Sequence, residues 1–182
     1  MNKSIGSLEF KSICKGIEVS NEILKQNNIE IIYSKSVCPG KFVIIFSGDS
    51  QDVKEAVCLG ESLDDNFLIE SFIINKVHNQ IIEGLKGKYI SKDIEGLCFG
   101  IVETLKICSG IKALDYALKS SDVNLFKIQL AFAIGGKFVF LITGSVSSVE
   151  NAIYNVKELL DKKEILNTAI IPFACKEIME KI

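Results

Sequence analysis

The chain contains one sequence unit twice. The segment IGSLEFKSICKGIEVSNEILKQNNIEII, which starts at Ile5, aligns with FGIVETLKICSGIKALDYALKSSDVNLF, which starts at Phe99, with matching residues 94 positions apart. Further along, GKFVIIFSGDSQDVKEAV from Gly40 matches GKFVFLITGSVSSVENAI from Gly136 at a spacing of 96, because the second copy has two extra residues before its Gly-Lys. A duplication of this length predicts two similar domains, because each copy can form a complete folding unit.

Within each copy, the spacing of apolar residues indicates a short strand followed by an amphipathic helix. Residues 5–10 and 99–104 are the expected strands. In the helices that follow, residues recur at the i, i+4, i+7 and i+11 positions that share one face. We expect these two faces to be buried, with the members Ile13, Ile17, Ser20 and Leu24 in the first copy and Ile107, Ile111, Leu114 and Leu118 in the second.

The rest of each copy predicts two further strands, a helix, a fourth strand and a short helix. In the first copy, residues 29–37 and 41–47 are rich in β-branched and aromatic residues, and Cys38-Pro39-Gly40 between them has the chemistry of a hairpin turn. The order is therefore β-α-β-β-α-β-α, an α+β fold in two tandem copies. We expect domains at residues 1–88 and 89–182, with the polar segment 86–93 as the joint between them.

Composition narrows the class of protein. Hydrophobic residues make up 48% of the chain and charged residues 24%, which suffices for a packed core, and no apolar run approaches the roughly 18 to 20 residues of a membrane span. The N-terminal residues do not resemble a secretory signal, so we expect a cytoplasmic protein with six reduced thiols. A net charge of -2 without a basic block argues against nucleic-acid partners, and we expect no membrane partner.

These repeated segments resemble the shell proteins of bacterial microcompartments, in their tandem-domain form. The resemblance covers nearly the whole chain: IGSLEF and FGIVETL resemble the opening strand of the family, EILKQNNIEI and YALKSSDVNL its edge helix and next strand, and FSGDSQDVKEAV and ITGSVSSVENAI its strand-to-helix turn. The segment SKSVCPGKF, residues 34–42, is the most specific match, because it resembles the cysteine-bearing pore loop of one subgroup of these proteins. Both copies begin with the first strand of the family, which is the unpermuted order.

The resemblance implies that three chains form a pseudohexameric tile around a central pore, in which other shell proteins of the facet are partners. It implies that the turns between the second and third strands face this pore, and that lysines lie at the tile edge. The implied pore residues are Ser36, Val37, Cys38, Pro39 and Gly40 in the first copy and Ala133, Ile134, Gly135 and Gly136 in the second, and the edge lysines are Lys25, Lys119 and Lys76. The second copy departs from the family pattern after its fourth strand, where Phe173 and Cys175 stand in place of a basic residue and a histidine.

Cys38 is a single cysteine in a turn, and three copies of it on a threefold axis would place three thiolates together. Soft sulfur ligands select iron-sulfur clusters, zinc or Cu(I). The resemblance implies a [4Fe-4S] cluster, one per trimer, that transfers electrons across the shell or delivers clusters, with encapsulated or cytosolic redox enzymes as further partners. The alternative is that Cys38 is an ordinary free thiol in a turn.

We expect structural roles for the remaining candidate residues, and we do not expect the protein to be an enzyme. We expect Cys14, Cys58, Cys98, Cys108 and Cys175 to be buried in the core, and His78, the one histidine, to open a short helix. The Lys of IGGKFVF is followed by Phe on a strand, so the segment is not a phosphate-binding loop. Two other functions stay open: a cluster-free shell tile with a metabolite pore, and a free cytosolic trimer that binds an effector.

Overall fold

The computed structural model describes residues 3–63, 66–89, 97–130, 136–179 and 181–182. The chain divides into two compact units, the first formed by residues 1–86 and the second by residues 87–130 and 137–182, while Gly136 groups with the first unit. The boundary at 88/89 that the sequence suggested stays a prediction. Part of the expected joint, residues 90–93, lies outside the described residues.

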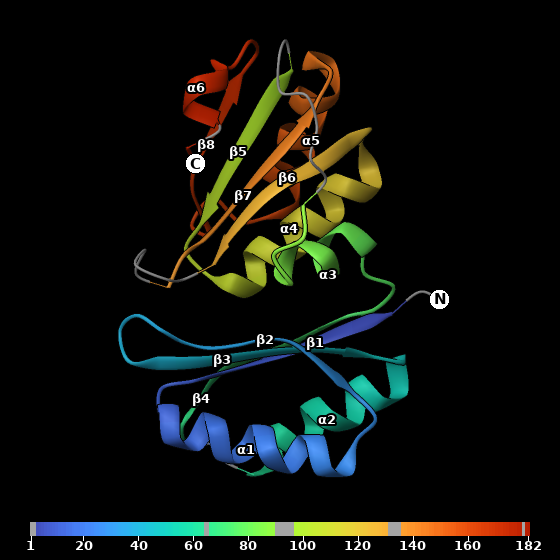
Figure 1. The fold of residues 1–182 in the computed structure, drawn as a ribbon, viewed down its shortest axis with the longest axis vertical. Coiled ribbons are helices and arrows are strands. Elements are labelled where there is room, and N and C mark those ends of the chain that lie inside the picture. The colour runs from blue at the N-terminus through green and yellow to red at the C-terminus, as the bar shows by residue number, and fades with distance from the viewer. Residues whose placement is uncertain (1–2, 64–65, 90–96, 131–135, 180) are drawn as a thin grey trace. The chain divides into compact units, whose positions relative to one another are not determined.

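Both units have the predicted order of elements (Figure 1). The first consists of β1 (Ser4–Phe10), α1 (Ile13–Gln26), β2 (Glu30–Val37), β3 (Lys41–Gly48), α2 (Ser50–Leu63), β4 (Leu68–Ile74) and α3 (Asn79–Leu85). The second consists of β5 (Cys98–Thr104), α4 (Ile107–Ser120), β6 (Val123–Leu130), β7 (Phe138–Gly144), α5 (Val146–Leu159), β8 (Ile165–Ile171) and α6 (Lys176–Met179). The α+β class is therefore confirmed, with one copy of the fold in each unit.

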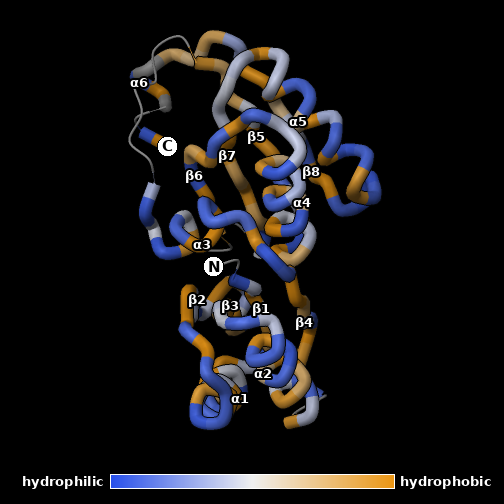
Figure 2. The backbone as a smooth tube through the Cα atoms, turned by 90° about the vertical axis from the view of Figure 1, so that its right-hand side faces the viewer, coloured by the Kyte–Doolittle hydropathy of each residue, from blue (hydrophilic) through white to orange (hydrophobic). Residues whose placement is uncertain are grey.

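Each unit is a four-stranded antiparallel sheet with its two long helices packed on one face. The strand orders are β2-β3-β1-β4 and β6-β7-β5-β8, so the first strand of each copy is central and the fourth lies at an edge. In Figure 1, α1 and α2 cover the same face of the first sheet. Figure 2 shows hydrophilic and hydrophobic residues interleaved along these helices, as expected for helices with one buried face.

A glycine on the first helix of each copy makes room for a phenylalanine on the third strand. A Cβ atom added to Gly16 would lie 2.5 Å from Phe42 Cδ1, and one added to Gly110 would lie 2.3 Å from Phe138 Cδ1. The helix backbone therefore approaches the aromatic ring directly. Because the same pair occurs in both copies, it fixes how the helix packs on the sheet in each unit.

We predict that Phe138→Ala destabilises the second unit by about 3–5 kcal/mol, because the ring is fully buried and its removal leaves a cavity. Urea unfolding of the chain would measure this loss. Phe173→Ala is the matched control, since Phe173 is 82% exposed and its removal should change stability by less than about 0.5 kcal/mol. Equal effects of the two substitutions would contradict the assignment of the core.

The predicted buried helix face is confirmed in the second copy and wrong for most of the first. Ile107, Ile111, Leu114 and Leu118 are all buried in α4. In α1 the buried residues are Gly16, Val19, Ser20 and Ile23, whereas Ile13, Ile17 and Leu24 are 37%, 55% and 38% exposed. Both helices place their glycine against the sheet, so the inward side of α1 is the one with Gly16, Val19, Ser20 and Ile23, whereas α4 also buries the neighbouring side that carries Ile107, Ile111 and Leu118.

The segment after the first unit is attached to the second by Tyr89. The Tyr89 hydroxyl donates to the carbonyl oxygen of Ile128 at 3.1 Å and accepts from its backbone N–H at 3.3 Å. Burial raises the pKa of Tyr89, so the hydroxyl stays protonated and keeps its role as donor at neutral pH.

Among the helices that the structure describes, none is long and apolar enough to cross a bilayer.

Candidate functional site

Cys38 lies at the tip of the hairpin between β2 and β3. The last paired residues are Val37 with Lys41, so Cys38, Pro39 and Gly40 form the whole turn. The Cys38–Pro39 peptide bond is cis, and Gly40 has a φ of 70°, a conformation that glycine adopts without strain. The turn that the sequence predicted is therefore confirmed in position and length.

Val37 is buried beside the turn, and its neighbours on both sides are exposed. Val37 is 4% exposed and anchors the end of β2 in the core. Ser36, Cys38, Pro39 and Gly40 are exposed. Consecutive side chains of a strand point to opposite faces, so Ser36 and Val37 face different sides of β2, and the strand ends before Cys38. The Cys38 thiol is thus accessible, while the hairpin beneath it is held by packing.

An ion pair at the base of this turn occurs in both copies. Lys41 Nζ lies 2.9 Å from Glu9 Oε1, and Lys137 Nζ lies 3.1 Å from Glu103 Oε1. These glutamates belong to the central strands β1 and β5, directly beside β3 and β7. The lysine of each Gly-Lys segment is therefore held by a carboxylate. The sheet register brings the two residues together, and Glu and Lys hold matching positions in the two copies.

The corresponding turn of the second copy is described only at its end. Gly136 has a φ of 82° and groups with the first unit, where a Cβ atom added to it would lie 3.4 Å from the carbonyl oxygen of Cys38. The other predicted pore residues of this copy, Ala133, Ile134 and Gly135, lie outside the described residues.

One chain offers a single thiol at this turn. Among the residues that the structure describes, no group of three or more His, Cys, Asp or Glu side chains is placed to hold a metal ion. Cys38 is exposed, and a thiolate is the ligand that iron-sulfur clusters require. The donor chemistry therefore fits such a cluster only where several chains bring their Cys38 side chains together.

The other cysteines divide into two groups, and the expectation that all are buried is wrong for three. Cys98 and Cys108 are buried, whereas Cys14, Cys58 and Cys175 are exposed. Cys14 is exposed because it lies on the outward side of α1 near Ile17. Burial raises the pKa of the Cys98 thiol, and the nearby Glu150 adds to this effect, so Cys98 is a poor source of thiolate.

The predicted edge lysines are exposed at the ends of helices or strands. Lys25, in the last turn of α1, lies 2.9 Å from Glu22, and Lys119, in the last turn of α4, lies 2.5 Å from Asp115. Hydrogen bonding to Lys25 lowers the pKa of Glu22. Lys76 follows β4 with a φ of 52°. Because exposed ion pairs are weak, Lys25 can exchange its partner at little cost.

His78 opens a short helix, as the sequence predicted. It is the N-cap residue of α3, and its Nδ1 atom accepts a hydrogen bond from the backbone N–H of Gln80 at 3.4 Å. This contact satisfies a free N–H group at the start of the helix, which is a structural role.

Comparison with known families identifies the repeated fold. The model of the BMC domain matches residues 4–77 and, again, residues 98–174. The chain therefore belongs to the BMC-domain family, the shell proteins of bacterial microcompartments, which is a structural and non-enzymatic family. This confirms the resemblance seen in the sequence.

One relative is similar to this chain over most of its length. The chain is 36% identical over 166 residues to the bacterial microcompartment shell protein PduT of Citrobacter freundii, which covers 91% of this chain and 89% of the relative. It also resembles the crystal structure of a microcompartment protein from Desulfitobacterium hafniense, with a TM-score of 0.93, 30% identity and 99% coverage of both chains. The fused permuted hexameric shell protein MSM0275 of the RMM microcompartment shares the fold, with a TM-score of 0.63, 17% identity and coverage of 86% of this chain and 82% of that one.

Proposed function

We propose that three copies of this chain form a pseudohexameric shell tile whose pore holds a [4Fe-4S] cluster. The observation that carries the proposal is the Cys38 thiol, exposed at the tip of a hairpin that buried Val37 and the Lys41–Glu9 pair hold in place. Three such thiolates would bind three irons and leave the fourth to a non-protein ligand. The remaining residues of the pore loops would be Ser36, Val37, Pro39 and Gly40 of the first copy and residues 133–136 of the second.

The exposed apolar side of α1 supports assembly into a ring. Ile13, Ile17 and Leu24 are exposed there, whereas their counterparts Ile107, Ile111 and Leu118 in the second copy are buried. The second copy buries this apolar helix side and the first copy exposes it, so in the first copy it is available for a contact with another chain. Repetition of that contact around an axis would close a ring.

The cluster, when bound, supplies a one-electron redox centre. The chain itself would contribute the thiolates, the rigid hairpin and a surface for redox enzymes on either side of the shell. Electron transfer through the shell, or delivery of the cluster to another protein, is the function that this arrangement supports best. Other shell proteins in the facet would be its structural partners.

The proposal is tested by anaerobic purification followed by iron and sulfide analysis and electron paramagnetic resonance. We expect about four irons per trimer and a signal that appears on reduction. A colourless trimer without iron, obtained under iron-replete anaerobic conditions, would contradict the cluster and leave a thiol-lined pore for a small metabolite. A trimer that does not form sheets at high protein concentration would instead indicate a free effector-binding protein.

We further propose that Lys25, Lys119 and Lys76 lie at contacts between tiles. Lys25→Ala combined with Lys119→Ala should reduce sheet formation several-fold without dissociating the trimer, because both side chains are exposed at helix ends. Electron microscopy of concentrated protein would measure the sheets, and light scattering the trimer. The control is Lys54→Ala, an exposed lysine of α2, which should leave the sheets unchanged. Equal loss of sheets in the control would contradict the edge assignment.

A further inference from the structure

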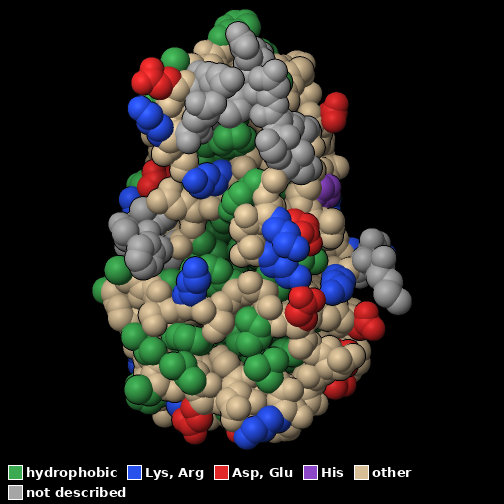
Figure 3. All heavy atoms as spheres, in the orientation of Figure 1, with side chains coloured by type: hydrophobic (Ala, Val, Ile, Leu, Met, Phe, Trp, Pro, Cys, Tyr) green, Lys and Arg blue, Asp and Glu red, His purple; other side chains and the backbone are tan. Residues whose placement is uncertain are grey.

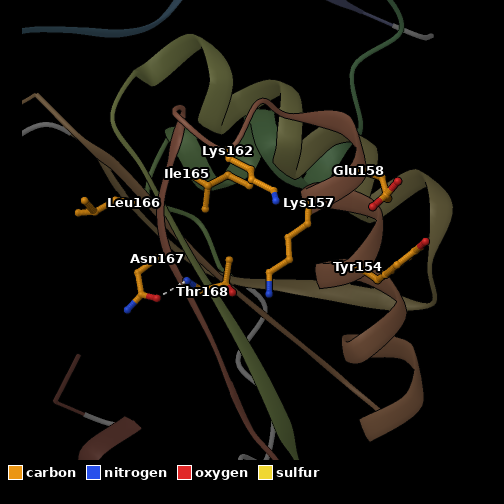
Figure 4. Close-up of a pocket in the computed structure, with 8 residues that line it drawn as sticks. All are labelled: Tyr154, Lys157, Glu158, Lys162, Ile165, Leu166, Asn167 and Thr168. Atoms are coloured by element: carbon orange, nitrogen blue, oxygen red, sulfur yellow. Dashed lines mark hydrogen bonds between the residues drawn. The ribbon is translucent and has the colours of Figure 1, made fainter.

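A pocket lined by charged, polar and apolar residues lies in the second unit, which is not the unit that carries Cys38. Its walls are the C-terminal half of α5, the turn after it and the start of β8 (Figure 4). Its volume is about 480 Å3, within the range of pockets that bind small metabolites. All of its lining residues belong to one unit, so the pocket is complete in a single domain.

Two lysines make this pocket electropositive. Lys157 of α5 and Lys162 of the following turn both point into it in Figure 4. Neither forms an ion pair with any other residue in the part of the chain that the structure describes. Glu158, on the Tyr154 side, is the single carboxylate in the lining, so two cations face one anion.

Neutral groups complete the lining. Asn167 Oδ1 accepts a hydrogen bond from the backbone N–H of Thr168 at 2.9 Å, which orients the amide and leaves its NH2 group as a donor. Tyr154 adds a hydroxyl, while Ile165 and Leu166 supply apolar surface. Donors and cations beside an apolar wall match a small molecule with an anionic head and a short carbon chain.

The same place in the first copy has the opposite charge. By the alignment of α2 with α5 and of β4 with β8, Lys157 corresponds to Glu61 and Thr168 to Ser71. Ser71 Oγ donates to Glu61 Oε1 at 2.5 Å, so a hydrogen bond joins the two elements where the second copy has its pocket. Since the fold forms with glutamate at this position, the lysine is not needed for folding, and the difference between the copies points to a ligand.

We propose that this pocket binds a small organic anion, whose carboxylate or phosphate group contacts Lys157 and Lys162. The short carbon chain would lie against Ile165. The inference does not rest on the proposed pore cluster, because it uses no residue of the turn at Cys38. A shell protein with this site would carry a binding position for an anionic metabolite on one domain of each chain.

The test uses isothermal titration calorimetry of the full chain at low ionic strength, with inorganic phosphate and n-butyrate as separate probes and n-butanol as the uncharged control. We expect saturable millimolar binding, at one site per chain, for at least one of the anions and none for butanol. Binding of phosphate alone would identify a phosphate ligand, and binding of butyrate alone a carboxylate. Lys157→Gln and Lys162→Gln should each weaken binding about fivefold, the factor expected for one partly exposed charge contact of about 1 kcal/mol.

The matched control is Lys163→Gln, which removes an exposed lysine from the same turn outside the pocket lining and should change affinity less than twofold. Thermal unfolding of each variant would verify that the exposed substitutions leave the fold intact. Equal weakening by Lys163→Gln would show only a diffuse charge effect and overturn the proposal. So would the absence of saturable binding for both anions to the folded wild-type chain.

Discussion

Cys38→Ser should remove all cluster iron and sulfide from the protein and leave the trimer intact. The reason is that a serine hydroxyl is a poor ligand for iron-sulfur clusters, and every thiolate of the proposed site is a copy of this one residue. The side chain is exposed in a turn, so its replacement removes little core packing. Iron and sulfide analysis, with electron paramagnetic resonance on anaerobic samples, would measure the loss, and light scattering the trimer.

Cys14→Ser and Cys58→Ser are matched controls for this experiment. Both cysteines are exposed in the same unit, but each lies on a helix rather than in the hairpin turn. We expect them to keep the full iron content. If Cys38→Ser retained its iron, or if either control lost it, the ligand assignment would be wrong.

Ile17→Glu should convert the trimer to a folded monomer and thereby abolish cluster binding as well. Ile17 is 55% exposed in the single chain, so a charge there costs the monomer little. In a ring that covers this side of α1, the carboxylate would be buried without a partner, at a cost of about 3–5 kcal/mol per contact. Light scattering and analytical ultracentrifugation would measure the mass, and circular dichroism the fold.

The second copy supplies a comparison for this prediction. Ile111, the counterpart of Ile17, is fully buried, and Ile111→Glu should destabilise the fold itself. Gln51→Glu adds the same charge to an exposed position of α2, outside this side of α1, and should leave the trimer intact. A trimeric, iron-bound Ile17→Glu protein would refute the role of this helix side. Figure 3 shows that hydrophobic side chains also reach the surface elsewhere on the molecule, so the test must be made at this position.

The order of elements could be predicted from the sequence because the same pattern of strands and helices occurs in both copies. Runs of β-branched and aromatic residues located the second and third strands of the first copy, and Cys38-Pro39-Gly40 marked the hairpin turn between them, since both signals are local. It was harder to predict which residues of each helix face the sheet. A period of 3.6 showed that α1 has an apolar side, but it could not show that Gly16 is the residue that meets the sheet.

The candidate site was predictable only in part, for the same reason. Cys38 was singled out by the resemblance of its surrounding segment to a known pore loop, not by the chemistry of one thiol. The burial of Cys98 and the exposure of Cys58 depend on which side of an element faces the sheet, and one sequence does not fix that side. The Glu9–Lys41 pair joins residues far apart in the sequence, so it required the sheet register to become visible.

Because Gly16 packs closely against Phe42, the position of α1 determines where the Cys38 turn lies. Phe42 pairs with Ser36 across the hairpin, two residues before Cys38, so the ring and the thiol belong to one rigid segment. A side chain at Gly16 would push this segment outward and displace the tip of the hairpin with it. A substitution at Gly16, which contacts no ligand, would then change the distances between the Cys38 thiols of neighbouring chains. The geometry of the metal site in the assembly would therefore depend on the packing inside each monomer.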